Sequence, residues 1–465
     1  MKRSLLCMGL LASLIATFSQ PSYAKVHYDL KNTQQIATIN KDAFSNKLLD
    51  IMHKVSTAKK RDLTRGDVLT ALIENQLLGE YAVKRFGVNK LVENNKVVFP
   101  PDIVAEQELR SVIQVAFDKE LAEARKKLGG TLDKNISQEQ PIKPTEWDGF
   151  LPPKDMLLLE IKLTDAGKAA AQKRILLQYN FSDQHKGSIS LWDVYQRQNV
   201  QGRNEIHNRN TDFTQQQARE IVVHRFIDYW IATQSNLTEQ DVKDIKKALT
   251  YKSYHDGFVT FIGIAADIHD DVQYLKDLAK KVTPAEVKSY YQHHKQDFKR
   301  IEKVKAQHIT VADEKTANMI IEQLKKGAKF ADLAKQFSMA MDKNTGGDLG
   351  WVVHNRNNPT WLSTLAFVQT VNVPSRPVRT PNGQWEILLI TAKEEGYQPA
   401  DSESVRYLAS QVIARQKMVK EYQTIRKNLI QQADIHISPI LKQEMINLEK
   451  DVMIAKPSEE DHHHH

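Results

Sequence analysis

Few residues of this 465-residue chain combine a reactive side chain with a spacing that suggests chemistry. The one cysteine, Cys7, lies in an N-terminal apolar run, so the rest of the chain has no thiol, disulfide or cysteine metal site. His293 and His294 are adjacent, but no further acid or histidine stands at a convincing metal-ligand spacing from them. No phosphate-binding loop, zinc-protease motif or serine-nucleophile elbow occurs. We therefore expect no metal and no cofactor, and nothing supports hydrolase or redox chemistry.

His308 stands in a more informative setting. It lies within the segment 304–311, whose alternation of apolar and polar residues is typical of a half-buried strand. Taken alone, a strand histidine is most simply a hydrogen-bonded structural residue. Aromatic residues follow it at Trp361, Phe367 and Trp385, and on their own these are most simply core. Any chemistry at His308 therefore depends on the elements that bring these residues together.

Those elements form a predicted α+β module at 301–397. Glycine and proline residues divide the module into short helices and strands. In chain order we expect a strand at 304–311, a helix at 315–326 ended by Gly327, a helix at 330–337, a glycine-bent turn at 346–350 leading into a strand, a short helix at 359–367, and a hairpin at 377–391.

Four motifs follow one another inside the module, and each is weak alone. They are KAQHI at 305–309, GAKFADLA at 327–334, GGDLGW at 346–351 and RPVRT at 376–380. In this order and spacing they resemble successive signatures of the parvulin family of peptidyl-prolyl isomerases. The run at 282–298 is similar to the connector that precedes this module in secreted foldases of the SurA and PrsA kind. The resemblance is firm for about 282–395, loose for the helical flanks and absent for roughly 131–190.

The resemblance implies catalysis of rotation about the bond before proline, whose barrier is about 18–20 kcal/mol. Such a site needs no cofactor and no covalent step. It grips the proline ring in an apolar cup and weakens amide resonance with polar, poorly solvated surroundings. Parvulins resemble this design, with two histidines on facing strands, a nearby cysteine or aspartate, and a cup that includes a methionine and phenylalanines.

Mapped residue by residue, the chain departs from the family pattern. His308 matches the first histidine and is the candidate catalytic residue. The candidate substrate-binding residues stand at or near the other positions: Ala340 for the cysteine or aspartate, Asn358 for the cup methionine, Leu362 for its phenylalanine with Trp361 adjacent, Phe367, and Trp385 for the second histidine.

These departures leave three hypotheses open. A cup rebuilt from the aromatic residues still isomerises proline peptides, or the module is degenerate and serves a non-catalytic chaperone. A third hypothesis is a dedicated partner of one exported protein, with 131–190 as its interface. The expected partners are unfolded or exported polypeptides. Nucleic acid is not expected, because the net charge of +8 is mild for this length and acidic residues are interleaved with basic ones.

The chain ends and flanks indicate an exported, largely helical protein. Lys2 and Arg3, the apolar run 5–18 and the small residue Ala24 are typical of a signal peptide. We expect it to direct the chain to the periplasm, with no stable membrane insertion after its removal. Only 18 of the 465 residues are glycine, which favours helices.

The predicted fold class is α+β, with a predominantly helical, chaperone-like body and one small α+β module. The predicted domains are a signal peptide at 1–24, an N-terminal helical region at 25–130, a linker at 131–155, a helical middle region at 156–300, the module at 301–397, a C-terminal helix at 398–450 that packs on the helical body, and a disordered tail at 451–465. Within them we expect a helix between an N-cap at Thr64 and Gly87, one at 103–127, one at 214–233, and one capped by Thr283 with Pro284 at its first position.

Overall fold

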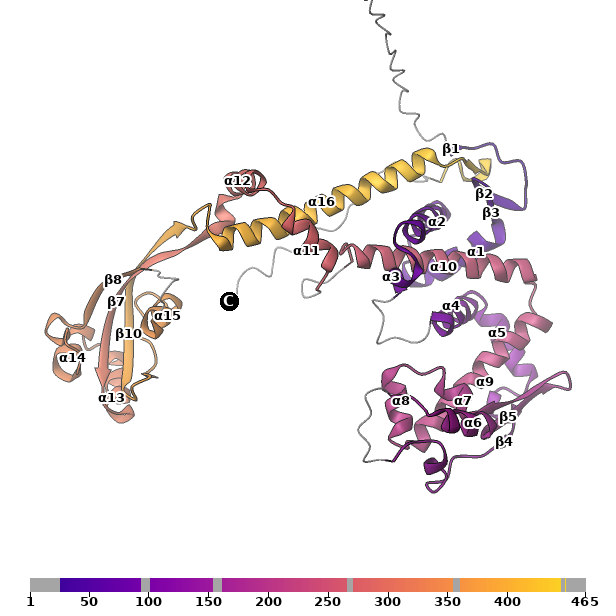
Figure 1. Ribbon diagram of the computed structural model, residues 1–465, viewed down its shortest axis with the longest axis horizontal. Coiled ribbons are helices and arrows are strands. Elements are labelled where there is room, and N and C mark those ends of the chain that lie inside the picture. Colours follow the sequence, from indigo (N-terminus) through magenta and orange to yellow (C-terminus); the bar gives the residue numbers. More distant parts are fainter. Residues whose placement is uncertain are drawn as a thin grey trace, which may run out of the picture. The chain divides into compact units, whose positions relative to one another are not determined.

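The computed structural model describes residues 26–92, 101–153, 161–265, 271–353, 360–444 and 448 (Figure 1). The chain divides into unit 1, which comprises Met1–Tyr274 and Met418–His465, and unit 2, which comprises Leu275–Lys417. The signal peptide expected at 1–24 and the tail expected at 451–465 lie outside the described residues. Across those residues, no helix has both the length and the apolar character needed to span a bilayer.

Unit 1 is mainly helical. Its helices are α1 (Asn46–Lys59), α2 (Arg65–Phe86), α3 (Val88–Val92), α4 (Pro101–Ala116), α5 (Asp118–Lys127), α6 (Asp165–Lys173), α7 (Leu191–Tyr195), α8 (Val200–His207), α9 (Thr211–Thr233), α10 (Glu239–Phe261), the start of α11 (Gln273–Lys280) and the second half of α16 (Glu403–Gln432). The caps of α2 confirm the prediction. Thr64 forms a capping box with Asp67, and Gly87 ends the helix with φ at +80°.

The helix predicted at 103–127 is interrupted. Phe117 has non-helical dihedral angles, φ −128° and ψ 34°, and separates α4 from α5. Its ring lies 5.1 Å from the ring of Trp230 and packs against the core of unit 1. The prediction of one continuous helix was wrong, because the packing of this aromatic ring accompanies non-helical dihedral angles that the apolar periodicity does not record.

A small sheet joins the two ends of unit 1. Its strands lie in the order β1 (Val26–His27), β11 (Ile435–Ile437), β2 (Gln35–Ile39) and β3 (Asp42–Ser45). The prediction of a helical region at 25–130 was wrong for β2 and β3. These two strands form a hairpin whose turn residue Asn40 has φ at +54°, and the apolar residues of β2 are buried in the core.

The described part of the segment 131–155, up to residue 153, is not the linker that we predicted there. It contains β4 (Ile136–Glu139), which pairs with β5 (Ile175–Ser182) in the sheet β4-β5-β6, where β6 is His185–Ser190. Trp147 is buried in the core, and its indole Nε1 donates a hydrogen bond to Thr211 Oγ1 at 3.3 Å. The hairpin of β5 and β6 also corrects the prediction of a purely helical middle region.

Unit 2 contains the α+β module. Its sheet has the order β8 (Asp348–Val353), β7 (Lys299–Val311), β10 (Trp385–Tyr397) and β9 (Val378–Arg379). Its helices are the rest of α11, α12 (Pro284–His293), α13 (Glu314–Lys325), α14 (Phe330–Phe337), α15 (Trp361–Val368) and the first half of α16. Helices α13 and α14 pack on one face of the sheet and α15 packs on the other (Figure 1). The predicted order of strands and helices in the module is confirmed.

The C-terminal helix serves both units. Val405 and Ile413 of α16 pack against Val287 of α12 within unit 2, whereas Tyr422 packs against Phe258 within unit 1. The prediction that this helix packs on the helical body therefore holds only for its second half.

The cap predicted at Thr283, with Pro284 at the first turn, is confirmed for α12.

Candidate functional site

The candidate site lies on one face of the sheet in unit 2. Residues alternate between the two faces along a strand, so His308 and Thr310 of β7 point to the same face. Thr310 pairs with Glu386 of β10, which places the glutamate on that face as well. The sheet therefore brings an imidazole, a hydroxyl and a carboxyl group together from two neighbouring strands.

His308 is held between two carboxylates. Its Nδ1 atom hydrogen-bonds to Glu386 Oε1, and its Nε2 atom lies 2.9 Å from Asp342 Oδ2. The second oxygen of Glu386 accepts a hydrogen bond from Thr310 Oγ1 at 2.8 Å. Because carboxylates only accept hydrogen bonds, both ring nitrogens of His308 are donors in this arrangement. We refer to Asp342, His308 and Glu386 as the charged triad.

The protonation of His308 follows from these neighbours. Burial favours the neutral imidazole, but hydrogen bonds and charge from Glu386 and Asp342 outweigh burial and raise the pKa of His308 above its ordinary value. The side chain of Glu386 is only 3% exposed, and a buried carboxylate is costly without a partner. The imidazolium and the Thr310 hydroxyl supply those partners.

Backbone contacts position the loop that carries Asp342. Met339 N donates to Thr310 O at 2.8 Å, and His308 N donates to Gly347 O at 2.8 Å, so the loop is tied to β7 at both ends. Gly347 has φ at +73°, and a Cβ atom there would lie 2.0 Å from His308 O. Only glycine fits this close approach, which gives the second glycine of the GGDLGW motif a structural reason.

The structure places the predicted site residues in different surroundings. Trp385 packs with the α13 and α14 cluster, on the face opposite to His308, so the two are not brought together. Ala340 lies in the loop of the charged triad, half-buried, two residues before Asp342. Phe367 packs in the cluster beneath α15, on the same sheet face as His308.

Two further predicted residues lie on α15. Trp361 is its first residue and is exposed, while Leu362 is half-buried. Asn358 lies outside the described residues. The substrate-binding roles assigned to these side chains stay predictions.

Sequence reasoning missed Asp342 and Glu386. The signal for Glu386 is present, because it is the one acid within the apolar run 385–390, and a buried acid in a central strand requires a partner. The acid stands next to Trp385, which the family pattern had drawn attention to. Asp342 carries no comparable signal, since loop acids are usually solvated.

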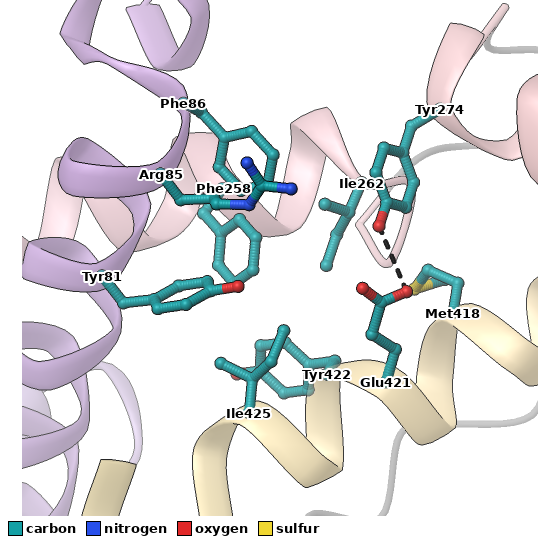
Figure 2. A pocket seen from close by; sticks show the side chains of 10 residues that line it. All are labelled: Tyr81, Arg85, Phe86, Phe258, Ile262, Tyr274, Met418, Glu421, Tyr422 and Ile425. Atoms are coloured by element: carbon teal, nitrogen blue, oxygen red, sulfur yellow. Dashed lines mark hydrogen bonds between the residues drawn. The ribbon is translucent and has the colours of Figure 1, made fainter. Parts of the chain in front are cut away.

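Unit 1 contains a separate aromatic pocket between α2, α10, α11 and α16 (Figure 2). The rings of Tyr81, Phe258 and Tyr422 face a common small cavity of about 50 Å³. Tyr274 OH donates a hydrogen bond to Glu421 Oε2 at 3.1 Å at one side of this space. Burial, together with the Glu421 carboxylate, raises the pKa of Tyr274 to about 12, so its hydroxyl remains a donor at neutral pH.

No metal centre is evident in the described ranges. Within them, no three histidine, cysteine, aspartate or glutamate side chains are grouped as metal ligands. The acids of the charged triad are instead engaged by His308 and Thr310.

Comparison with known proteins identifies the domain that carries the charged triad. Residues 282–406 match the family described as the PPIC-type PPIASE domain. The foldase protein PrsA of Bacillus subtilis is 34% identical over 157 residues, which cover 34% of this chain and 50% of the foldase. The periplasmic chaperone PpiD of Haemophilus ducreyi is 30% identical over 161 residues, which cover 34% of this chain and 26% of the chaperone.

The chain is also similar to solved structures. A PpiC-type peptidyl-prolyl cis-trans isomerase domain is 32% identical, and the match covers 21% of this chain and 97% of that domain, with a TM-score of 0.19. PrsA from Bacillus subtilis is 24% identical, with coverages of 54% and 91% and a TM-score of 0.19. The chain spans about half the length of the curated PrsA foldases of Caldanaerobacter subterraneus and Bacillus subtilis. The family match and the four ordered motifs agree that residues 282–406 belong to the parvulin family of PPIC-type domains.

Proposed function

We propose that this chain is a folding factor for exported proteins, and that unit 2 binds proline-containing segments of unfolded polypeptides beside the charged triad. The observation that carries the proposal is the position of Asp342. Its carboxylate is fixed by His308 yet its side chain remains 26% exposed, so it can face a bound peptide. The other carboxylate of the triad, Glu386, is buried and is bonded to His308 and Thr310.

The chemistry follows from amide resonance. The double-bond character that resists rotation before proline places negative charge on the carbonyl oxygen. A fixed carboxylate near that oxygen disfavours this charge and so lowers the barrier to rotation. Both ring nitrogens of His308 already donate to carboxylates, so the histidine acts by holding Asp342 in place. No proton transfer and no cofactor is required.

Apolar side chains near the charged triad are available to grip a proline ring. Phe367 and Leu362 come from α15, which covers the sheet face that His308 shares. Met339 and Met341 flank Ala340 in the triad loop, and both are exposed. Methionine adapts to varied apolar shapes, which suits a protein that binds many sequences.

The aromatic pocket of unit 1 supports a second role for the chain, which is to hold unfolded polypeptide without catalysing isomerisation. It lies outside the PPIC-type domain, and its aromatic lining suits one apolar side chain of an extended polypeptide. An unfolded client held there would be kept from aggregating without any isomerisation. Such binding should be weak, because ordering a flexible chain costs conformational entropy.

The proposed compartment is the periplasm. The basic start, the apolar run and Ala24 support export of the chain. The relative from Haemophilus ducreyi is named a periplasmic chaperone, which also supports this location. The proposed clients are unfolded exported proteins.

One experiment tests the proposal and separates its two parts. Isomerisation of a short X-Pro peptide is measured with the mature protein, with Asp342→Asn and with His308→Ala, while suppression of client aggregation is followed in the same preparations. We expect turnover that falls at least about tenfold in both variants, because the electrostatic effect of the fixed carboxylate is lost. Equal turnover in all three proteins would overturn the role of the charged triad. Suppression of aggregation without turnover would make the chain a chaperone that uses its PPIC-type domain for binding alone.

A further inference from the structure

We infer that Met339 and Met341 are oxidation sites, and that their conversion to methionine sulfoxide by peroxides releases proline-containing clients from unit 2. The inference rests on the proposed function, because it concerns the same proline site. It adds a chemical class of reactant, a peroxide, and a reversible control over the binding of clients.

The loop of the charged triad exposes two thioethers to solvent. Met339 is 59% exposed and Met341 is fully exposed, and in the described part of the chain no large apolar residue is more exposed than Met341. Methionine is among the residue types that are most often buried, as Met418 is at 1% exposure. Core packing therefore does not explain the two methionines that flank Ala340.

Thioethers are the sulfur groups that an oxidant meets in this protein. The one cysteine, Cys7, belongs to the predicted signal peptide, so the rest of the chain has no thiol that competes for a peroxide. Among the methionines that the structure describes, Met339, Met341 and Met319 of α13 are exposed. A peroxide must reach the sulfur atom to react, so the two loop methionines should be oxidised early and the buried Met418 late.

The reaction is a two-electron oxygen transfer. The lone pair of the thioether sulfur attacks one oxygen of hydrogen peroxide, and the O–O bond breaks as the S–O bond forms. The proton of the transferred hydroxyl passes to the departing hydroxide, which leaves as water. The sulfur is oxidised by two electrons and the peroxide is reduced by two. Methionine sulfoxide reductases convert the product back to the thioether, so the change is reversible.

Backbone contacts place both methionines at the proposed proline site. Met339 N donates a hydrogen bond to Thr310 O at 2.8 Å, on strand β7 and two residues after His308. Met341 directly precedes Asp342, whose carboxylate oxygen Oδ2 lies 2.9 Å from His308 Nε2. A change of polarity in these two side chains therefore occurs beside the charged triad.

Oxidation replaces an apolar group by a strong hydrogen-bond acceptor. The thioether of methionine packs against apolar groups of varied shape. A sulfoxide oxygen pressed against a proline ring would lose its water, and proline has no N–H to donate in exchange. Because burial of a polar group without a partner is unfavourable, the oxidised loop should release the proline. The charged triad stays chemically unchanged, since none of its three side chains contains sulfur.

The experiment follows oxidation and binding on the same full-length protein. The protein is treated with hydrogen peroxide, and sulfoxide at each methionine is measured by mass spectrometry of proteolytic peptides. Affinity for a short X-Pro peptide is read by fluorescence anisotropy at each time point. We expect Met339 and Met341 to be oxidised at least about tenfold faster than Met418, and the affinity to fall at least about fivefold as they react. Methionine sulfoxide reductase should restore it.

Variants locate the effect. The double variant Met339→Leu, Met341→Leu forms no sulfoxide in the loop, so its affinity should be the same before and after peroxide, whatever its starting value. Met319→Leu is the matched control, because Met319 is 37% exposed in the same unit but lies on α13, and its affinity should still fall on oxidation. Met341→Gln, whose side chain is polar like the sulfoxide, should weaken binding without peroxide, and Met319→Gln should not.

The outcomes separate this inference from the proposed function. Affinity that is unchanged after full oxidation of Met339 and Met341 would overturn the inference and retain the proline site. An equal loss of affinity in the double leucine variant would overturn the assignment to these two residues. A lower midpoint of urea unfolding for the oxidised protein would overturn it in favour of general damage. Absence of peptide binding before oxidation would overturn the proposed proline site, and the inference with it.

Discussion

Two partly buried histidines, one in each unit, have pKa values that are shifted in opposite directions. His308 in unit 2 lies between Glu386 and Asp342, and its pKa is raised despite burial. His255 in unit 1 lies between Asn75 Oδ1 at 2.8 Å and the hydroxyl of Tyr422 at 2.9 Å. Burial lowers the pKa of His255 to about 4, so its ring is neutral at neutral pH.

The difference shows that burial alone does not decide the state of an imidazole. Burial disfavours the charged form of both rings, and only the ring with two carboxylate partners overcomes that cost. The neutral ring of His255 donates to an amide oxygen through one nitrogen and accepts from a phenol through the other. His255 therefore ties three helices of unit 1 together, whereas His308 fixes a charged group that can act on a bound peptide.

The same substitution at the two positions should have its largest effect in unit 2. His308→Leu leaves Glu386 buried with only the Thr310 hydroxyl as partner, because the imidazolium is lost. Removing one partner of a buried ion pair costs about 3–5 kcal/mol. We expect this loss in the free energy of unfolding of unit 2, measured by urea denaturation with hydrogen exchange read separately for 299–311.

Glu395→Ala is the control for this measurement. Glu395 pairs with Lys299 on the same two strands, but its side chain is 59% exposed, so its loss should have little effect. A loss from His308→Leu no larger than that of the control would show that the charged triad contributes nothing to the stability of the sheet.

The next largest effect should follow from Gly347→Ala, which tests the loop of the charged triad without changing a charge. The new Cβ atom would lie 2.0 Å from His308 O, and the residue has φ at +73°. We expect a loss of about 2–4 kcal/mol from strain and displaced backbone together. Gly383→Ala is the control, since Gly383 has φ at +81° but no atom within 4 Å of the added carbon. Urea denaturation of both variants separates the clash from the strain of a positive φ.

The fold of the module could be predicted well because its signals are local. Helix α14 begins and ends where the apolar pattern indicates, and α13 differs by one residue at each end. Two of the missed strands, β1 and β4, have partners that lie far away in the chain. Strand β1 pairs with β11, and β4 pairs with β5, so neither pairing leaves a periodic trace in its own segment.

The candidate site could be predicted only in part, for a geometric reason. The family pattern singled out His308 as the candidate catalytic residue, a role that stays a prediction, and it directed attention to Trp385 as its partner. Adjacent residues on a strand point to opposite faces, so a displacement of one position moves the predicted partner away from His308. The true partner is Glu386, and its pairing with Thr310 depends on a strand register that no local motif records.

The two histidines should also respond to pH in opposite directions. The raised pKa of His308 gives unit 2 stability that is fully present below the unfolded pKa of about 6.5 and is lost as pH rises through the folded pKa. The lowered pKa of His255 makes unit 1 less stable as pH falls, because the unfolded chain takes up a proton that the folded ring does not. Unit 1 should lose stability from pH 6.5 down to about 4, by on the order of 3 kcal/mol at most.

NMR titration of ¹³C-labelled histidine checks the charge states directly. The pKa of the His308 ring should lie above the ordinary value of a histidine, and the ring of His255 should remain neutral at pH 5, with assignments from single histidine variants. A His255 ring that titrates near 6.5 would remove the contrast, since it would mean that burial in unit 1 has no electrostatic effect.

The smallest effect should come from His255→Leu, the counterpart of the first substitution. Leucine removes two neutral hydrogen bonds and leaves Asn75 Oδ1 and the Tyr422 hydroxyl without this partner. Because no charge is left unpaired, the loss should be about 1–2 kcal/mol in the free energy of unfolding of unit 1. His255→Gln, which can offer one donor and one acceptor, should recover part of it. If His255→Leu cost as much as His308→Leu, hydrogen bonding rather than charge would dominate both sites, and the fixed carboxylate of Asp342 would lose its electrostatic explanation.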